Sequence, residues 1–183
     1  MDNKRDHLLS AAKGAFLRHG YKRVSMSDIA EAAGISRPAL YLVFKSKEEI
    51  FRGVYRQWVE GTLAEIGGGV SAFKSLDEKL RFAFDAWAVR TFEAARRSPE
   101  AEELIGCTLG FAKDEARAGD EAFGRCLASI IASSRKGRRS ARGPSPERTA
   151  RALVAAIRGF KQAATDAADL RQMIDDLLAL YLG

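Results

Sequence analysis

The chain has 183 residues, of which 46% are hydrophobic and 30% charged, a composition typical of a soluble globular protein and unlike that of a disordered one. No apolar run approaches the roughly 20 residues that a membrane-spanning helix needs, and Met1 to Asp6 lack the apolar stretch of a secretory signal. We therefore expect no membrane partner and a cytoplasmic location, with room for one small domain and one larger domain.

The net charge of +6 is unevenly distributed along the chain. Residues 1–47 contain nine Lys and Arg against four acids, and residues 135–142 contain five basic residues and no acid. The remaining residues carry a net negative charge. A basic amino-terminal module on a slightly acidic body indicates a polyanion as the partner of that module.

Residue types that carry catalysis or bind metals are sparse and scattered. Cys107 and Cys126 lie 19 positions apart and form neither a CxxC pair nor a disulfide framework. His7 and His19 have no cysteine or acid cluster at metal-binding spacing, and no phosphate-binding glycine loop or nucleophile elbow is present. We expect no catalytic residues, no metal, no cofactor and no enzyme activity.

Four helices are predicted in the first third of the chain. The first covers residues 3–19 and ends at Gly20; the second follows Ser25, whose hydroxyl and Asp28 form a capping box. The third is short and is capped by Ser36. The fourth begins after Ser46 and runs to the glycines at 67–69. Gly34, Ile35 and Ser36 between the second and third helices are typical of the turn in a helix-turn-helix.

Five more helices are predicted in the rest of the chain. One covers residues 76–96 and is apolar nearly all round, so it should be central. A short helix ends near Gly106, and a longer one runs from about Thr108 to Arg135 with three glycines that could bend or break it. The last two helices follow Ser145 and Asp166. Since no strand alternation is present, the fold is predicted to be all-α with about nine helices.

Residues 8–51 resemble the DNA-binding domain of the tetracycline-repressor (TetR) family. More than fifteen positions match without a gap: Leu8, Ala11, Ala12, Phe16, Gly20, Tyr21, Ser25, Met26, Ile29, Ala30, Ala33 to Ser36, Leu40, Tyr41, Phe44 and Ser46 to Phe51. The resemblance implies a helix-turn-helix domain over residues 1–46 and a helical domain for ligand binding and dimerisation over residues 47–183. It also implies double-stranded DNA as the partner.

The third predicted helix is expected to enter the DNA. Arg37 at its tip is expected to bind a guanine, with a phosphate contact as the alternative. Outward-facing Pro38, Ala39 and Leu42 are expected to meet thymine methyl groups. Phosphate contacts are carried over from the family and supported by the helix caps. The predicted DNA-binding set is Ser25, Ser27, Ser36, Arg37, Pro38, Ala39, Tyr41, Leu42, Lys45 and Lys47.

The last two predicted helices each have a wide apolar stripe, and two copies could form a four-helix interface. One short recognition helix is too little for specific binding, so a homodimer on a near-palindrome is expected. The alternative is that these stripes cover the core of the protomer. The predicted interface residues are Leu153, Ile157, Phe160, Leu170, Met173, Ile174, Leu177, Leu178 and Tyr181.

Family members usually keep a ligand cavity in the helical domain, and the aromatic residues there are its candidate lining, although aromatics at helical spacing are more often simply core. The predicted lining is Trp58, Phe84, Trp87, Thr91, Phe111 and Phe123. The resemblance implies a repressor that a small, apolar effector releases from its operator by shifting the fourth helix. A regulator without a ligand and a sequence-independent architectural DNA binder are the alternatives, and the basic run at 135–142 is predicted to be a solvated loop.

Overall fold

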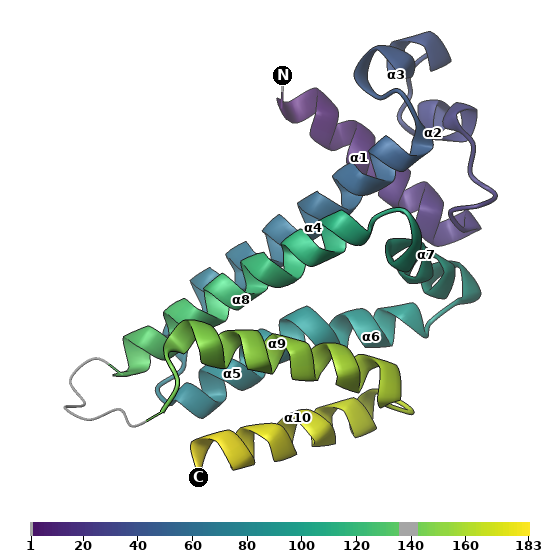
Figure 1. The fold of residues 1–183 in the computed structure, drawn as a ribbon. Coiled ribbons are helices and arrows are strands. Elements are labelled where there is room, and N and C mark those ends of the chain that lie inside the picture. Colours follow the sequence, from purple (N-terminus) through teal and green to yellow (C-terminus); the bar gives the residue numbers. More distant parts are fainter. Residues whose placement is uncertain (1, 136–142) are drawn as a thin grey trace. The chain divides into compact units, whose positions relative to one another are not determined.

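The protein is described by a computed structural model that covers residues 2–135 and 143–183 (Figure 1). Its helices are α1 Asp2–His19, α2 Met26–Ala32, α3 Arg37–Val43, α4 Lys47–Gly69, α5 Leu76–Phe84, α6 Arg90–Ala95, α7 Pro99–Gly110, α8 Lys113–Arg135, α9 Pro146–Ala163 and α10 Ala167–Leu182. A 3-10 turn, Val70–Ala72, follows α4. A π-helical stretch, Asp85–Val89, joins α5 to α6 without a break, so the described residues form nine continuous helical segments and no strand. The all-α prediction is confirmed.

Serine and aspartate caps begin the helices where the sequence predicts them. Ser25 and Ser75 each form a complete capping box, with Asp28 and Glu78 respectively. Ser145 and Asp166 accept a hydrogen bond from the backbone N–H three residues on and begin α9 and α10. Because these signals depend only on neighbouring residues, the sequence alone reveals them.

One predicted boundary is wrong. α7 continues to Gly110 and α8 begins at Lys113, whereas the sequence placed the end of the shorter helix near Gly106. The chain turns at Phe111 and Ala112, whose side chains pack into a hydrophobic core, and α8 then runs unbroken through Gly119 and Gly124. Of the three glycines that could interrupt the helix, Gly110 therefore stands at the break, and Gly119 and Gly124 do not. Arg135 ends α8, and the rest of the basic run, 136–142, lies outside the described residues.

The helices form two compact units. The first comprises Met1–Glu60 with Ala94–Arg117, and the second comprises Gly61–Glu93 with Ala118–Gly183. The first unit therefore contains α7, although 52 residues separate Pro99 at the start of α7 from residue 46, the end of the predicted helix-turn-helix. From the sequence, a boundary is instead expected after residue 46, between a DNA-binding domain and a domain for ligand binding and dimerisation. That boundary is defined by function and stays a prediction.

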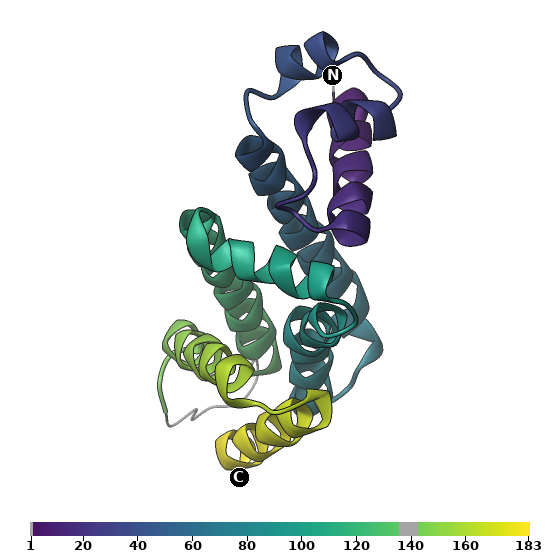
Figure 2. The same ribbon diagram turned by 90° about the vertical axis from the view of Figure 1, so that its right-hand side faces the viewer.

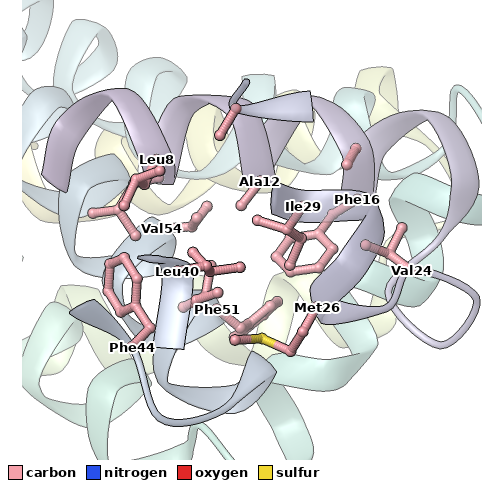
Figure 3. Packing of buried hydrophobic residues seen from close by; sticks show 14 of the residues in the cluster. Leu8, Ala12, Phe16, Val24, Met26, Ile29, Leu40, Phe44, Phe51 and Val54 are labelled. Carbon is pink, nitrogen blue, oxygen red and sulfur yellow. The ribbon is translucent and has the colours of Figure 1, made fainter. Parts of the chain in front are cut away.

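The core of the first unit lies among α1, α2, α3 and the start of α4 (Figure 3). Leu8, Phe16, Ile29, Leu40 and Phe44 are fully buried there. Leu40 lies within α3 and Phe44 is the residue that caps its carboxyl end, and because both are buried in this core the opposite face of α3 is outward. The inward face that the sequence predicts for this helix is confirmed.

The core of the second unit is built around an aromatic group on the α5–α6 helix and on α8. The rings of Trp87 and Phe123 are stacked, with centroids 4.5 Å apart and planes within 8°, and Phe84 meets Phe123 edge-on at 6.0 Å. All three side chains are buried. In the same unit α9 and α10 lie side by side, as Figures 1 and 2 both show.

Candidate nucleic-acid interface

The turn between α2 and α3 sets the direction of the exposed helix. Gly34 has φ +66°, and its N–H donates to the carbonyl of Glu31, while the N–H of Ile35 donates to that of Ala30 at 2.9 Å. This pair of bonds is a Schellman motif, which ends α2 and needs a residue with positive φ. Ser36 follows directly and caps α3 by accepting from the N–H of Ala39.

Replacing Gly34 by alanine is expected to destabilise the protein by about 1–2 kcal/mol. A Cβ at Gly34 would meet no atom within 4 Å, so the cost comes from the backbone conformation and not from a clash. Gly61→Ala is the matched control, because Gly61 lies inside α4, also without a neighbour within 4 Å, and should stabilise by about 0.5–1 kcal/mol. Urea unfolding followed by circular dichroism measures the free energy of unfolding of both variants. If the two substitutions change this free energy in the same direction, the explanation by backbone conformation is wrong.

The outer face of α3 presents a cation and apolar groups to solvent. Leu42 has 82% of its surface exposed, and Arg37, Pro38 and Tyr41 are exposed beside it. The Arg37 guanidinium lies 5.6 Å from the ring centroid of Tyr41, one turn along the helix. Among the described residues Arg37 has no acidic partner, so its charge is available to an anion or to a base edge. Leu42, exposed on the same helix, is suited to contact with an apolar group such as a thymine methyl.

Two further helix starts lie in the same unit. At α2 the Ser25 backbone N–H and hydroxyl donate to Asp28 at 2.8 and 2.9 Å, and these bonds lower the pKa of the Asp28 carboxyl. Ser27 is exposed in the first turn. At α4 the hydroxyl of Ser46 accepts from the N–H of Glu49 at 3.2 Å. Free N–H groups at such starts bind phosphates.

Two lysines predicted to bind phosphate have different surroundings. Lys45 is exposed, and its ammonium donates only to the carbonyl of Tyr41 among the described groups, at 3.3 Å. The Lys47 ammonium instead donates to the carbonyls of Tyr21 at 2.8 Å and Lys22 at 3.4 Å and lies 4.4 Å from the centre of the Tyr21 ring. Lys47 therefore braces the turn between α1 and α2, with one N–H left for a phosphate.

Contacts from α1 and α7 also position this region, and the sequence did not reveal them. The Arg5 guanidinium lies 4.4 Å from the centre of the Phe44 ring at the end of α3, and the His7 side chain bonds to the carbonyl of Ala33 at 3.2 Å. On α7, Glu103 accepts from the Lys22 N–H at 2.7 Å, and Glu100 pairs with Arg23 at 3.5 Å. These partners are far apart in sequence, so no local pattern indicates them.

The predicted pocket residues fall into two groups. Phe84, Trp87, Thr91 and Phe123 belong to the second unit, where the Thr91 hydroxyl donates to the Trp87 carbonyl at 3.1 Å. Phe111 belongs to the first unit, and its ring centroid lies 5.2 Å from those of both Tyr21 and Phe51. Trp58 is also in the first unit, where its ring packs against that of Tyr55 at 5.6 Å. A role in ligand binding stays a prediction for all six.

The predicted dimer residues divide by exposure. Five of them are buried inside the protomer: Leu153, Ile157, Leu170, Ile174 and Leu178. These five therefore match the alternative interpretation, a stripe that covers the protomer core. Phe160, Met173, Leu177 and Tyr181 are half-buried, and Leu180, which was not among the predicted residues, is 85% exposed on α10. A partner would contact this second set.

Three arginines of the second unit form ion pairs with acidic side chains of the same unit. Arg81 pairs with Asp77 and Asp175, Arg90 with Asp85 and Glu65, and Arg171 with Glu93. The hydrogen bonds that Arg90 donates to the carboxylates of Glu65 and Asp85 raise the pKa of Arg90. A hollow of about 180 Å³ lies among Arg81, Asp85, Val89, Arg171, Ile174 and Asp175, and its basic groups are already paired.

Residues 2–135 and 143–183 contain no group of three His, Cys, Asp or Glu placed to hold a metal ion. Over the same residues no helix combines the length and the apolarity that crossing a bilayer requires.

Comparisons with known proteins match the amino-terminal part of the chain, which contains the candidate interface, to a family of regulators. Residues 8–54 match the model of the bacterial regulatory proteins of the tetR family. The chain is 33% identical over 86 residues to the transcriptional activator FasR of Mycolicibacterium smegmatis, covering 47% of this chain and 39% of that one. It is 35% identical over 102 residues to the uncharacterized transcriptional regulator YfiR of Bacillus subtilis, covering 50% of each. The matches thus span half or less of these relatives.

Similarity to a solved structure extends over nearly the whole chain. The crystal structure of Thermus thermophilus FadR, a TetR-family transcriptional repressor in complex with lauroyl-CoA, superposes with a TM-score of 0.68. The match covers 97% of this chain and 93% of that one at 24% identity. At 24% identity this similarity shows the fold of the chain, including the part beyond residue 54. It does not show which ligand the chain binds.

Proposed function

We propose that this chain, whose residues 8–54 match the model of the bacterial regulatory proteins of the tetR family, is a cytoplasmic transcriptional repressor. It would bind a near-palindromic operator as a homodimer and be released by a small ligand. The family is not enzymatic, in agreement with the sequence-based prediction. One observation carries the proposal: the exposed face of α3, with Arg37 and Leu42 outward, is fixed by capped turns on both sides.

The proposed contacts divide into two kinds. Ser25, Ser27, Tyr41, Lys45 and Lys47 would bind phosphates and set the register without reading sequence. Arg37 would read a guanine through two hydrogen bonds in the major groove, and the apolar groups on α3 would meet thymine methyls. Two copies of α3, about 34–36 Å apart or further, would enter major grooves on one side of the duplex.

Release by a ligand would act through α4. This helix is continuous from Lys47 to Gly69 and contributes residues to both units. A ligand that binds more tightly when α4 is displaced would favour the state in which the two α3 helices no longer fit the operator. Its effect is limited by the difference between its affinities for the two states.

Arg37→Ala is expected to weaken operator binding by about 1–3 kcal/mol and to abolish the preference at one base pair. The operator is first obtained by selection from a random duplex pool, and affinity is then measured by fluorescence anisotropy on that duplex and on single-base variants. If Arg37 only contacts a phosphate, all sequences will weaken alike and the base assignment fails.

Lys45→Ala is the matched control. Lys45 is exposed and its ammonium bonds only to the Tyr41 carbonyl among the described groups, so its removal disturbs fewer contacts within the protein than removal of Lys47 would. It should weaken all sequences equally and lower the slope of log affinity against log salt by about one for each contact. A wild-type protein that binds every duplex with the same affinity across the salt series would contradict the repressor and support an architectural binder.

A further inference from the structure

Arg5 lies at the amino-terminal end of the buried stripe of α1. Leu8, Leu9 and Ala12 continue this stripe and are buried. Arg5 precedes Leu8 and Leu9 by three and four residues, so it faces the same side of the helix, and its side chain is half-buried. Arg5 is therefore directed toward a neighbouring helix at the edge of the core and not freely into solvent.

The neighbour of Arg5 is the carboxyl end of α3. Its guanidinium lies over the ring of Phe44, 4.4 Å from the ring centroid, and Phe44 is the fully buried residue that caps α3. Figures 1 and 2 both show the amino-terminal end of α1 at the same end of the first unit as α3. The face of an aromatic ring attracts a cation, and this contact leaves the N–H groups of the guanidinium for other partners.

The charge of Arg5 is not neutralised by an acid of the described structure. The adjacent acid, Asp6, accepts a hydrogen bond from the side-chain amide of Gln57 on α4 at 3.3 Å and is thus directed elsewhere. Among the side chains that the structure describes, no carboxylate pairs with Arg5 and no acceptor takes one of its N–H groups. A guanidinium that is held in place but unpaired, in the basic part of the chain, is available to an anion.

Lys45 brings a second cation to the same end of α3. It follows Phe44 directly, is exposed, and donates to the carbonyl of Tyr41 in the last turn of the helix. The 7 residues of α3 extend about 10 Å, whereas the major groove of DNA is about 12 Å wide. Cations at the end of a helix that enters this groove are therefore within reach of the phosphates that border it.

We propose that Arg5 is a DNA contact on α1, outside the two helices of the helix-turn-helix: the Phe44 ring holds its guanidinium beside Lys45, and there it binds a backbone phosphate. The proposal rests on the proposed function, because α3 must enter the major groove. A guanidinium binds a phosphate through two parallel hydrogen bonds, and a side chain that already lies against a ring loses little freedom on binding. The contact adds affinity and helps to fix the register on the duplex without reading sequence.

Arg5→Met tests the contact through its salt dependence. Methionine keeps an unbranched apolar side chain over the Phe44 ring and removes the charge. Fluorescence anisotropy on the selected operator should show the slope of log affinity against log salt lowered by about one for each Arg5 contact. Between about 50 and 200 mM salt the variant should therefore lose about three- to fourfold less affinity per contact than the wild type.

Lys13→Met is the matched control, because it removes one exposed lysine from the same helix, more than two turns from Arg5. It should leave the slope unchanged. Arg5→Lys keeps the charge and should retain the slope of the wild type. Arg5→Gln serves the same comparison if Arg5→Met does not fold.

Uncharged linkages locate the phosphate. Operator duplexes that carry one methylphosphonate at a time show which phosphates the wild type contacts, because each neutralised contact weakens binding. At one such position in each half-site Arg5→Met should bind the charged and the neutral duplex with affinities equal within about twofold. Lys13→Met should distinguish the two duplexes as the wild type does.

A purely structural role of Arg5 gives a different result. Loss of packing on Phe44 would lower the melting temperature and weaken binding at every salt concentration, with the slope and the sensitivity to each linkage as in the wild type. That result overturns the phosphate contact, and so does an Arg5→Met variant that cannot be distinguished from the wild type.

The same measurements separate this proposal from the function on which it rests. Specific operator binding with an unchanged slope in Arg5→Met would overturn the contact and leave the repressor. A wild type that binds every duplex alike, with a slope that depends on Arg5, would support the contact and overturn the repressor.

Discussion

Replacing Leu180 by aspartate is expected to convert the protein to a monomer and to weaken binding to its selected operator about a thousandfold or more, to the level of non-specific DNA. Leu180 is 85% exposed in the protomer, so the carboxylate costs little there. In a dimer built on α9 and α10 the same carboxylate would be buried beside Met173, Leu177 and Tyr181 without a partner, at a cost of several kcal/mol.

Analytical ultracentrifugation at micromolar concentration measures the assembly, and fluorescence anisotropy with the selected duplex measures the affinity. Leu17→Asp is the matched control, because Leu17 is an exposed leucine of α1, with 42% of its surface accessible, outside the proposed interface. It should remain dimeric. A dimeric Leu180→Asp variant would place the partner surface elsewhere on the chain.

The second large effect is expected from Phe16→Ala, which should lower the free energy of unfolding by about 3–5 kcal/mol. Phe16 is fully buried, and its ring centroid lies 5.3 Å from that of Tyr21 and 6.3 Å from that of Phe51. The truncation leaves a cavity at the centre of the first unit. Since domains are stable by about 5–15 kcal/mol in total, the loss is a large share.

Urea unfolding followed by circular dichroism measures this loss, and operator binding near the growth temperature should fall with it. Phe16→Leu refills most of the space and should cost less than half as much. Phe73→Ala is the control for an aromatic truncation, because Phe73 is only partly buried in the second unit and, among the described rings, packs against that of Phe82 alone. Equal losses for Phe16→Ala and Phe73→Ala would contradict the cavity argument.

Local signals in the sequence predicted most of the helices and much of the candidate interface. Ser25, Ser36 and Ser145 begin helices as the sequence indicates, and Leu40 lies on the buried face of α3. Such features depend on residues within one or two turns of each other, which a single sequence displays.

Contacts between distant segments were not predictable in this way. The bond between the Lys22 N–H and Glu103 joins residues 81 positions apart, and Lys47 reaches the carbonyl of Tyr21 across 26 positions. No periodic pattern encodes such pairs. The π-helical stretch at Asp85–Val89 lies in a segment that is apolar on nearly every face, so a shift of one residue leaves the hydrophobic pattern unchanged.

The division of the first unit into two stretches of chain has a consequence for its biosynthesis. A ribosome delivers residues 8–54 well before Ala94–Arg117, so the nascent helix-turn-helix initially lacks Glu103 against its first turn and the Phe111 ring against Tyr21 and Phe51. Its fold is completed only when more than half of the protein has been made. A nascent chain that ends before Ala94–Arg117 is therefore expected to have a less stable first unit.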